Sequence, residues 1–178
     1  MPNILPFETI ARFFQDFEHT AFRLETRRGY AVDIGTERYE RFLRGEPLEF
    51  DPTQPWHTNV QRQTAAGKRF ERVRLVDDPI TIGQRFLLTS GLSNAQAGED
   101  IRNLPRADAD RLGLPRFDYW LFDSKTLVRF HFDEADNTLG VEITEDPVAV
   151  LAACQARDAA WHFATPTRDF AARVLSGV

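Results

Sequence analysis

Cysteine is almost missing from this chain of 178 residues, in which Cys154 is the single copy. One thiol excludes a disulfide framework and a cysteine-rich zinc site. The alanine-rich stretch around Cys154 favours a small buried side chain over a nucleophile. Long apolar runs are missing too, since none approaches the roughly 18 residues that a membrane helix needs. Residues 1–8 lack the basic start and apolar run of a signal peptide. We therefore expect a protein of the reduced cytoplasm that does not contact a membrane.

The usual metal and cofactor motifs are also missing. The four histidines are His19, His57, His131 and His162, and no pair has H-E-x-x-H or H-x-H spacing, so no metal site is expected. The chain has no P-loop, no G-x-G-x-x-G fingerprint and no G-x-S-x-G elbow. We therefore expect no cofactor, and any reaction would depend on the side chains of the protein alone.

Lysine is scarce, because Lys68 and Lys125 are the two lysines among 22 basic residues. The net charge of −5 disfavours direct binding of nucleic acid. A cluster of arginines lies near the N-terminus, at Arg23, Arg27, Arg28, Arg38, Arg41 and Arg44. Glu37, Glu40 and Glu46 are interspersed with this cluster, which indicates a solvated helix face rather than a surface for nucleic acid.

The length fits one domain over residues 1–178, and its first third is predicted to hold a helix, a hairpin and a second helix. Phenylalanines at helical spacing predict a helix over 6–19. Alternation predicts strands over 21–26 and 30–32, joined in a hairpin by a turn at 28–29. Thr36 and Gly45 bound a predicted helix over 37–44, and prolines mark a loop over 46–56. Residues 57–67 show no clear pattern.

The remaining two thirds alternate between strands and helices. The predicted elements are a strand at 70–76, a helix that opens at Asp78-Pro79 and runs to about 90, a strand at 100–104, a loop at 105–116, and helices at 148–163 and 167–174. Arg72 and Arg74 are expected to point outward from their strand. Strands at 117–122, 126–132 and 138–143 follow one another closely, so we expect antiparallel neighbours. The predicted fold class is α+β (mixed α/β), a central mixed sheet with flanking helices.

Five segments carry a resemblance to a known family. They are AFRLE at 21–25, RVRLV at 72–76, GEDIR at 98–102, DYWLFD at 118–123 and RDAAW at 157–161. Together they resemble an uncharacterised actinobacterial family, described as a domain of unknown function, whose members are often encoded near helix-turn-helix regulators. This resemblance implies no established activity.

A second, more distant resemblance is to one half of a phospholipase D-like domain. It rests on YWLFD at 119–123, VRFH at 128–131 and WHFA at 161–164. It implies a core over 70–166, with residues 1–56 as an N-terminal extension packed on it. The catalytic H-x-K-x-x-x-x-D motif of that superfamily is missing, because Ala66 and Asp123 stand two positions before the lysines. The resemblance therefore excludes phospholipase D-type chemistry and implies a domain that only binds.

Charged side chains stand inside apolar strands, where a charge must be paired, at an edge or in a cleft. Arg23 and Glu25 share one strand face, because strand side chains repeat every two residues. The charges either form a structural network, such as Asp118 or Asp123 with Arg129 or Arg157, or line a polar cleft roofed by tryptophans. The ligand-binding candidates are Arg23, Trp56, Arg74, Arg102, Trp120, Arg129, Arg157 and Trp161. The acid–base candidates are His131, Glu25, Asp118, Asp123 and Glu99.

Two hypotheses of function remain open. The favoured one is a non-catalytic cytoplasmic binding or regulatory module for a small molecule or a partner protein, such as a helix-turn-helix regulator, and a homodimer is compatible with it. The alternative is a cofactor-independent enzyme of specialised metabolism that uses carboxylate and histidine acid–base chemistry. His131 is its best proton-transfer candidate, because the unperturbed pKa of histidine lies near 6.5.

Overall fold

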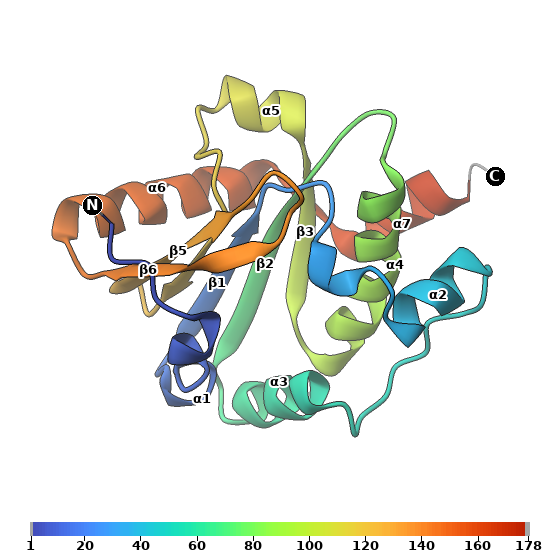
Figure 1. Cartoon of the computed structure of the whole chain (residues 1–178), viewed down its shortest axis with the longest axis horizontal. Helices are drawn as coiled ribbons and strands as arrows, with labels where there is room; N and C mark the ends of the chain where they lie inside the picture. Colours follow the sequence, from blue (N-terminus) through green and yellow to red (C-terminus); the bar gives the residue numbers. More distant parts are fainter. Residues whose placement is uncertain (1, 177–178) are drawn as a thin grey trace.

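The computed structural model describes residues 2–176 and contains a seven-stranded sheet in the order β6-β5-β4-β1-β2-β3-β7 (Figure 1). The strands are β1 (Thr20–Glu25), β2 (Arg69–Val76), β3 (Asp100–Pro105), β4 (Tyr119–Phe122), β5 (Thr126–Phe132), β6 (Thr138–Thr144) and β7 (Thr165–Pro166). β1 pairs in parallel with β2, and β2 with β3, whereas the other neighbouring strands are antiparallel. The predicted mixed sheet is confirmed. The three strands expected to be antiparallel neighbours, now β4, β5 and β6, are confirmed as well.

Helices cover both faces of this sheet. The α-helices are α1 (Phe13–Asp16), α2 (Glu37–Leu43), α3 (Pro55–Ala65), α4 (Ile82–Ala97), α5 (Arg106–Arg111), α6 (Pro147–Phe163) and α7 (Thr167–Leu175), and the 3-10 helices are η1 (Phe7–Ile10) and η2 (Ala31–Asp33). One face buries Phe22, Leu24 and Tyr119 against α6. The other face buries Phe70 and Trp120 against the N-terminal helices and α3. Two apolar layers therefore enclose the sheet, which lies between α6 and α3 in Figure 1.

The predicted N-terminal hairpin is wrong. Residues 31–33 form the 3-10 helix η2 instead of a second strand, and both edges of β1 are occupied by β2 and β4. The hairpin pattern failed because β1 finds its partners about 50 and 100 positions further along the chain, as the pairs Arg23↔Arg72 and Arg23↔Trp120 show. Residues 20–25 therefore lie at the centre of the sheet rather than in an extension packed on a 70–166 core.

Four further segments differ from their predictions. The helix expected over 6–19 is divided into η1 and α1, and it ends at Asp16 because Phe17 adopts an extended backbone that leads into β1. The segment without a clear pattern forms α3, which begins with Pro55 at its first turn. The loop expected over 105–116 contains α5. The helix expected to open at Asp78-Pro79 begins at Ile82 instead, with Thr81 as its N-cap, and continues past Gly91 to Ala97.

Candidate functional site

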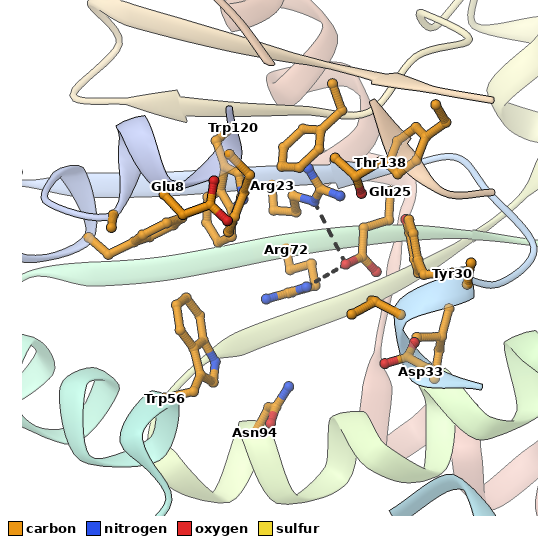
Figure 2. A pocket seen from close by; sticks show the side chains of 18 of the residues that line it. Glu8, Arg23, Glu25, Tyr30, Asp33, Trp56, Arg72, Asn94, Trp120 and Thr138 are labelled. Atoms are coloured by element: carbon orange, nitrogen blue, oxygen red, sulfur yellow. Dashed lines mark hydrogen bonds and ion pairs between the residues drawn. The ribbon is translucent and has the colours of Figure 1, made fainter. Parts of the chain in front are cut away.

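A cavity of about 1140 Å³ lies over the sheet face formed by β1, β2, β4 and β5 (Figure 2). Its walls come from η1, η2, α3, α4 and β6. Phe14, Trp56, Trp120, Phe130 and Phe132 give it an aromatic lining. Ligand pockets for small organic molecules typically measure about 300–1,000 Å³, so this cavity has the size of a binding site. The cavity lies over β1. This strand has β2 and β3 on one side of it in the sheet, and β4, β5 and β6 on the other.

The floor of this cavity is charged. Arg23 and Glu25 point up from β1, and Arg72 and Arg74 from β2, which the register places directly beside them. All four are 4–9% exposed, so the outward orientation predicted for Arg72 and Arg74 is wrong. The reason is the central position of β2 between two parallel strands, which buries both of its faces.

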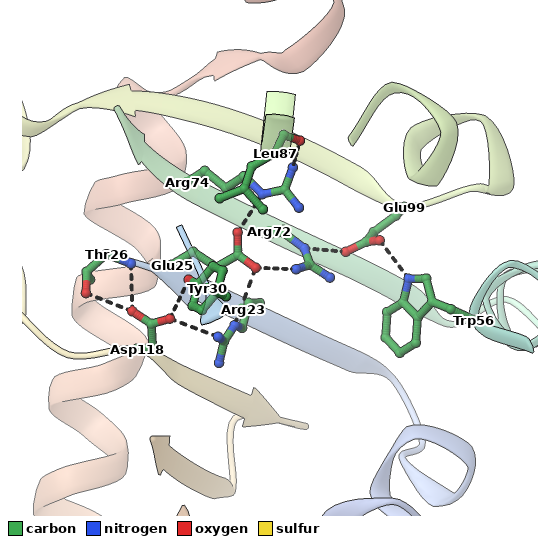
Figure 3. Close-up of polar contacts among 10 residues, drawn as sticks. All are labelled: Arg23, Glu25, Thr26, Tyr30, Trp56, Arg72, Arg74, Leu87, Glu99 and Asp118. Atoms are coloured by element: carbon green, nitrogen blue, oxygen red, sulfur yellow. Dashed lines mark hydrogen bonds and ion pairs between the residues drawn. The ribbon is translucent and has the colours of Figure 1, made fainter. Parts of the chain in front are cut away.

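Glu25 is the centre of a network of ion pairs (Figure 3). Its Oε1 accepts a hydrogen bond from Nη1 of Arg72, and its Oε2 accepts one from Nε of Arg74 at 2.5 Å. The Nε of Arg23 lies 3.7 Å from Oε1. One buried carboxylate therefore holds three guanidinium groups together on two adjacent strands.

The network continues in two directions from Glu25. On one side, Nε of Arg72 donates to Glu99 at 2.6 Å, and Glu99 also accepts the indole N–H of Trp56 at 3.1 Å. On the other side, Asp118 accepts from Nη2 of Arg23 at 2.9 Å. Three more donors reach Asp118, namely the backbone N–H of Thr26 at 2.7 Å, the hydroxyl of Thr26 at 2.7 Å and the hydroxyl of Tyr30 at 2.6 Å. Three positive and three negative groups thus balance in charge beneath the cavity.

Gly91 of α4 makes room for this network. A Cβ atom at Gly91 would lie 2.5 Å from Nη1 of Arg74, and that nitrogen donates to the backbone oxygen of Leu87. The glycine inside the helix is therefore explained by close approach of a side chain from the sheet rather than by a helix end.

The ion pairs shift the pKa values of the buried groups. Burial raises the pKa of Glu25, but the arginines Arg74, Arg72 and Arg23 outweigh burial and lower it to about 2. Burial lowers the pKa of Arg72, but Glu99 and Glu25 outweigh this and raise it. The pKa of Tyr30 lies well above its usual value because of burial and the nearby carboxylates of Glu25 and Asp118. Glu25 and Arg72 therefore stay charged, and Tyr30 stays neutral, across the physiological range.

A family model for a domain of unknown function, DUF6879, matches residues 8–172. The chain belongs to the DUF6879 family. No curated protein matches it. The match covers the whole sheet and every residue of the charged network, and it confirms the expected membership of an uncharacterised domain family.

The site of this DUF6879 chain combines seven of the predicted residues. Arg23, Glu25, Arg74, Trp56 and Trp120 line the cavity, and Glu99 and Asp118 complete the network beneath it. The structure therefore places an ion-pair network at the same point as two of the three tryptophans expected in the cleft, Trp56 and Trp120. Asp118, however, pairs with Arg23 rather than with the predicted Arg129 or Arg157.

Four predicted ligand-binding residues, Arg102, Arg129, Arg157 and Trp161, do not line this cavity. Arg102 stacks on Trp161 on the opposite face, with its guanidinium carbon 3.8 Å from the ring centroid. The guanidinium of Arg129 lies 4.2 Å from the ring of Phe117. Arg157 donates to Ser124 and Asp158 at 2.7 and 2.9 Å. These side chains were misplaced because the strand positions of Arg102 and Arg129 alternate away from the cavity face.

Two predicted acid–base residues also lie outside the cavity. His131 pairs with Glu142 on β6 at 3.2 Å and points away from the face that carries Phe130. Asp123 accepts the backbone N–H groups of Glu18, His19 and Thr20 at 2.7–3.0 Å, so it fixes the entry into β1. Neither side chain lines the cavity.

Sequence reasoning missed three residues that line the cavity. Arg72 was overlooked although the alternation R-x-R on a strand places it on the face of Arg74. Tyr30 and Asp33 come from η2, which was predicted as a strand, so no pattern in the sequence placed them here. Burial and the charge of Glu25 raise the pKa of Asp33, and among the described residues its carboxylate has no hydrogen-bond partner.

Within residues 2–176, no helix has the length and apolar character needed to cross a membrane. Across the same range, His, Cys, Asp and Glu side chains nowhere gather in threes in a way that could hold a metal ion.

Proposed function

We propose that this DUF6879 chain is a binding module that holds a small organic molecule in the cavity over β1 and β2. The observation that carries the proposal is the cavity itself, which joins aromatic walls to a charged floor that is already ordered. Because Glu25 and Asp118 fix the arginines beneath it, the floor needs little rearrangement when a ligand enters. Such apolar pockets with a few fixed polar groups are typical ligand sites.

The enzymatic alternative has less support. A general base works best with a pKa near the operating pH, whereas the pKa of Glu25 is about 2. The carboxylate oxygens of Glu99 and Asp118 already accept hydrogen bonds within the network. Asp33 is the wall residue that favours this alternative, because its pKa is raised and its carboxylate faces the cavity (Figure 2). The test is to look for a compound that the wild-type protein converts and that Asp33→Asn does not. Such a compound would show that the protein is an enzyme rather than a binding module.

A thermal-shift screen of small organic compounds tests the proposal, since a ligand of the native state raises the unfolding midpoint. Ser90→Phe places a bulky ring in the cavity wall, and Ala152→Phe places the same ring on exposed α6, behind the sheet. We expect compounds that stabilise the wild-type protein and Ala152→Phe but not Ser90→Phe. Equal stabilisation of both variants, or no stabilising compound, would contradict a ligand site in this cavity.

We propose in addition that the module acts in the cytoplasm with a helix-turn-helix regulator as its partner. The support is the resemblance to an actinobacterial family encoded near such regulators, and to non-catalytic phospholipase D-like domains. Affinity capture with and without a stabilising compound tests this part. A regulator retained in one of the two states is expected, and retention that is absent or equal in both would contradict it.

A further inference from the structure

The three buried arginines of the cavity floor have hydrogen-bonding capacity that the protein does not use. Among the described residues, one terminal nitrogen of each guanidinium lacks a hydrogen-bond partner, namely Nη1 of Arg23 and Nη2 of Arg72 and Arg74. The nitrogen of Arg23 is fully enclosed, and its guanidinium carbon lies 4.0 Å from the ring centroid of Phe130. The nitrogens of Arg72 and Arg74 keep accessible surface, and both residues line the cavity.

The acids of the network are used more completely. Each of the six carboxylate oxygens of Glu25, Glu99 and Asp118 accepts at least one hydrogen bond from a described residue. The floor therefore presents spare N–H donors to a ligand rather than spare oxygens. Figure 3 shows the unpaired guanidinium nitrogens beside the paired ones. Because Nη2 of Arg72 and Nη2 of Arg74 are accessible and have no acceptor among the described residues, a ligand oxygen can accept hydrogen bonds from them without breaking the network.

Aromatic rings surround these donors. The ring centroids of Phe14, Trp56 and Trp120 lie 5.0–6.1 Å from one another, and the indole of Trp56 is fixed by its bond to Glu99. Flat aromatic rings pack well against such edges and faces. The same pocket therefore offers an aromatic wall together with the guanidinium groups of Arg72 and Arg74.

Charge limits the ligand to one negative group. The network is neutral as a whole, and two more carboxylates, Glu8 and Asp33, line the cavity. These acids would repel a dianion more strongly than a monoanion, whose single charge is stabilised by the spare guanidinium donors. We propose that the ligand is a monoanionic aromatic carboxylate, with its oxygens on Nη2 of Arg72 and Arg74 and its ring against Trp56 and Trp120.

This inference rests on the proposed binding function, and a series of matched probes separates the two. The probes are 1-naphthoate, its neutral amide 1-naphthamide, the dianion 1-naphthyl phosphate and the cation 1-naphthylmethylammonium. Their affinities are measured by calorimetry at constant ionic strength. Charge-assisted hydrogen bonds are about twice as strong as neutral ones, so we expect 1-naphthoate to bind about tenfold more tightly than each of the others.

Two variants keep a positive charge and remove the guanidinium fork. Arg72→Lys alters the floor, and Arg102→Lys alters the opposite face of the sheet. We expect the preference for naphthoate over naphthamide to fall below about threefold in Arg72→Lys and to stay unchanged in Arg102→Lys. Because the probe series needs no variant, it decides the question even if Arg72→Lys fails to fold.

The other outcomes overturn the inference in distinguishable ways. Equal affinity for all four probes, or a preference for the amide, the phosphate or the cation, would refute a carboxylate ligand but leave a binding site in the cavity. No measurable binding of any naphthalene probe would refute the aromatic carboxylate as well. The proposed binding function would itself fail only if the screen with Ser90→Phe also found no ligand of the cavity.

Discussion

Replacing Glu25 with glutamine removes the carboxylate that contacts Arg23, Arg72 and Arg74 while keeping nearly the same volume. Glutamine resembles the protonated acid, so the pKa of Glu25 gives the size of the effect. That pKa falls from an ordinary 4.5 to about 2 in the folded protein. Each pKa unit corresponds to about 1.4 kcal/mol, so the charge stabilises the fold by about 3 kcal/mol at neutral pH. Breaking a buried ion pair typically costs about 3–5 kcal/mol, which agrees.

The measurement is thermal and denaturant unfolding of wild-type protein and Glu25→Gln as a function of pH. At pH 7 we expect a loss of about 3 kcal/mol and, for a chain of this size, a drop in midpoint of about 6–12 °C. The folded pKa of Glu25 lies below its unfolded value. Its contribution is therefore complete above about pH 4.5 and is lost as the pH falls toward 2. The difference between the two proteins should shrink over that window.

Glu46→Gln is the matched control, because Glu46 pairs with Arg41 and Arg44 at the exposed surface. We expect its unfolding midpoint to equal that of the wild type within error, since exposed pairs contribute little. A Glu25→Gln protein as stable as this control would refute the reasoning. A stability difference that stayed constant from pH 7 to pH 2 would refute it as well.

Three further perturbations test the neighbourhood of the site. Gly91→Ala should destabilise the protein by about 1–3 kcal/mol in thermal unfolding, because the new Cβ would collide with Arg74 although alanine favours helices. Asp123→Ala should cost about 1–2 kcal/mol by removing the acceptor of three backbone N–H groups, with no change in probe affinity. Tyr30→Phe should cost about 1–2 kcal/mol by removing the hydroxyl that donates to Asp118. The pKa of Tyr30 is raised by burial and nearby carboxylates, so its stabilising effect should be lost only as the pH rises above about 10, together with alkaline unfolding.

Each of these three has an outcome that contradicts it. A Gly91→Ala protein at least as stable as the wild type would mean that Arg74 does not need the space. Weaker probe binding in Asp123→Ala would connect that residue to the site. Phenolate absorbance that rises before unfolding in the wild type, but not in Tyr30→Phe, would show Tyr30 ionising in the folded protein.

Local pattern was enough for most of the fold. Local sequence signals predicted α6, β2, β5 and β6 close to their observed bounds. These elements are set by the periodicity of a few consecutive residues. The local pattern failed where a contact with a distant part of the chain determines the structure. Examples are residues 31–33, which form a 3-10 helix, and Gly91, which lies inside a helix against Arg74.

The candidate site was predicted in part for the same reason. A charge inside an apolar strand needs a partner, and this rule alone selected Arg23, Glu25 and Asp118. It could not select the partners, because these depend on which strands are neighbours and in which register. It also grouped Arg102 and Trp161 with the cleft, although strand alternation turns Arg102 to the other face.

The sequence by itself therefore determined the composition of this protein, the type of most of its elements and the presence of charges that had to be satisfied in its core. Tertiary structure alone decided that β1 lies between β2 and β4, that Glu25 holds three arginines and that Arg72 and Arg74, each with a spare donor, line an aromatic cavity. Secondary structure follows from neighbours in the chain, whereas an ion-pair network depends on strands that are far apart in sequence and adjacent only in the folded sheet.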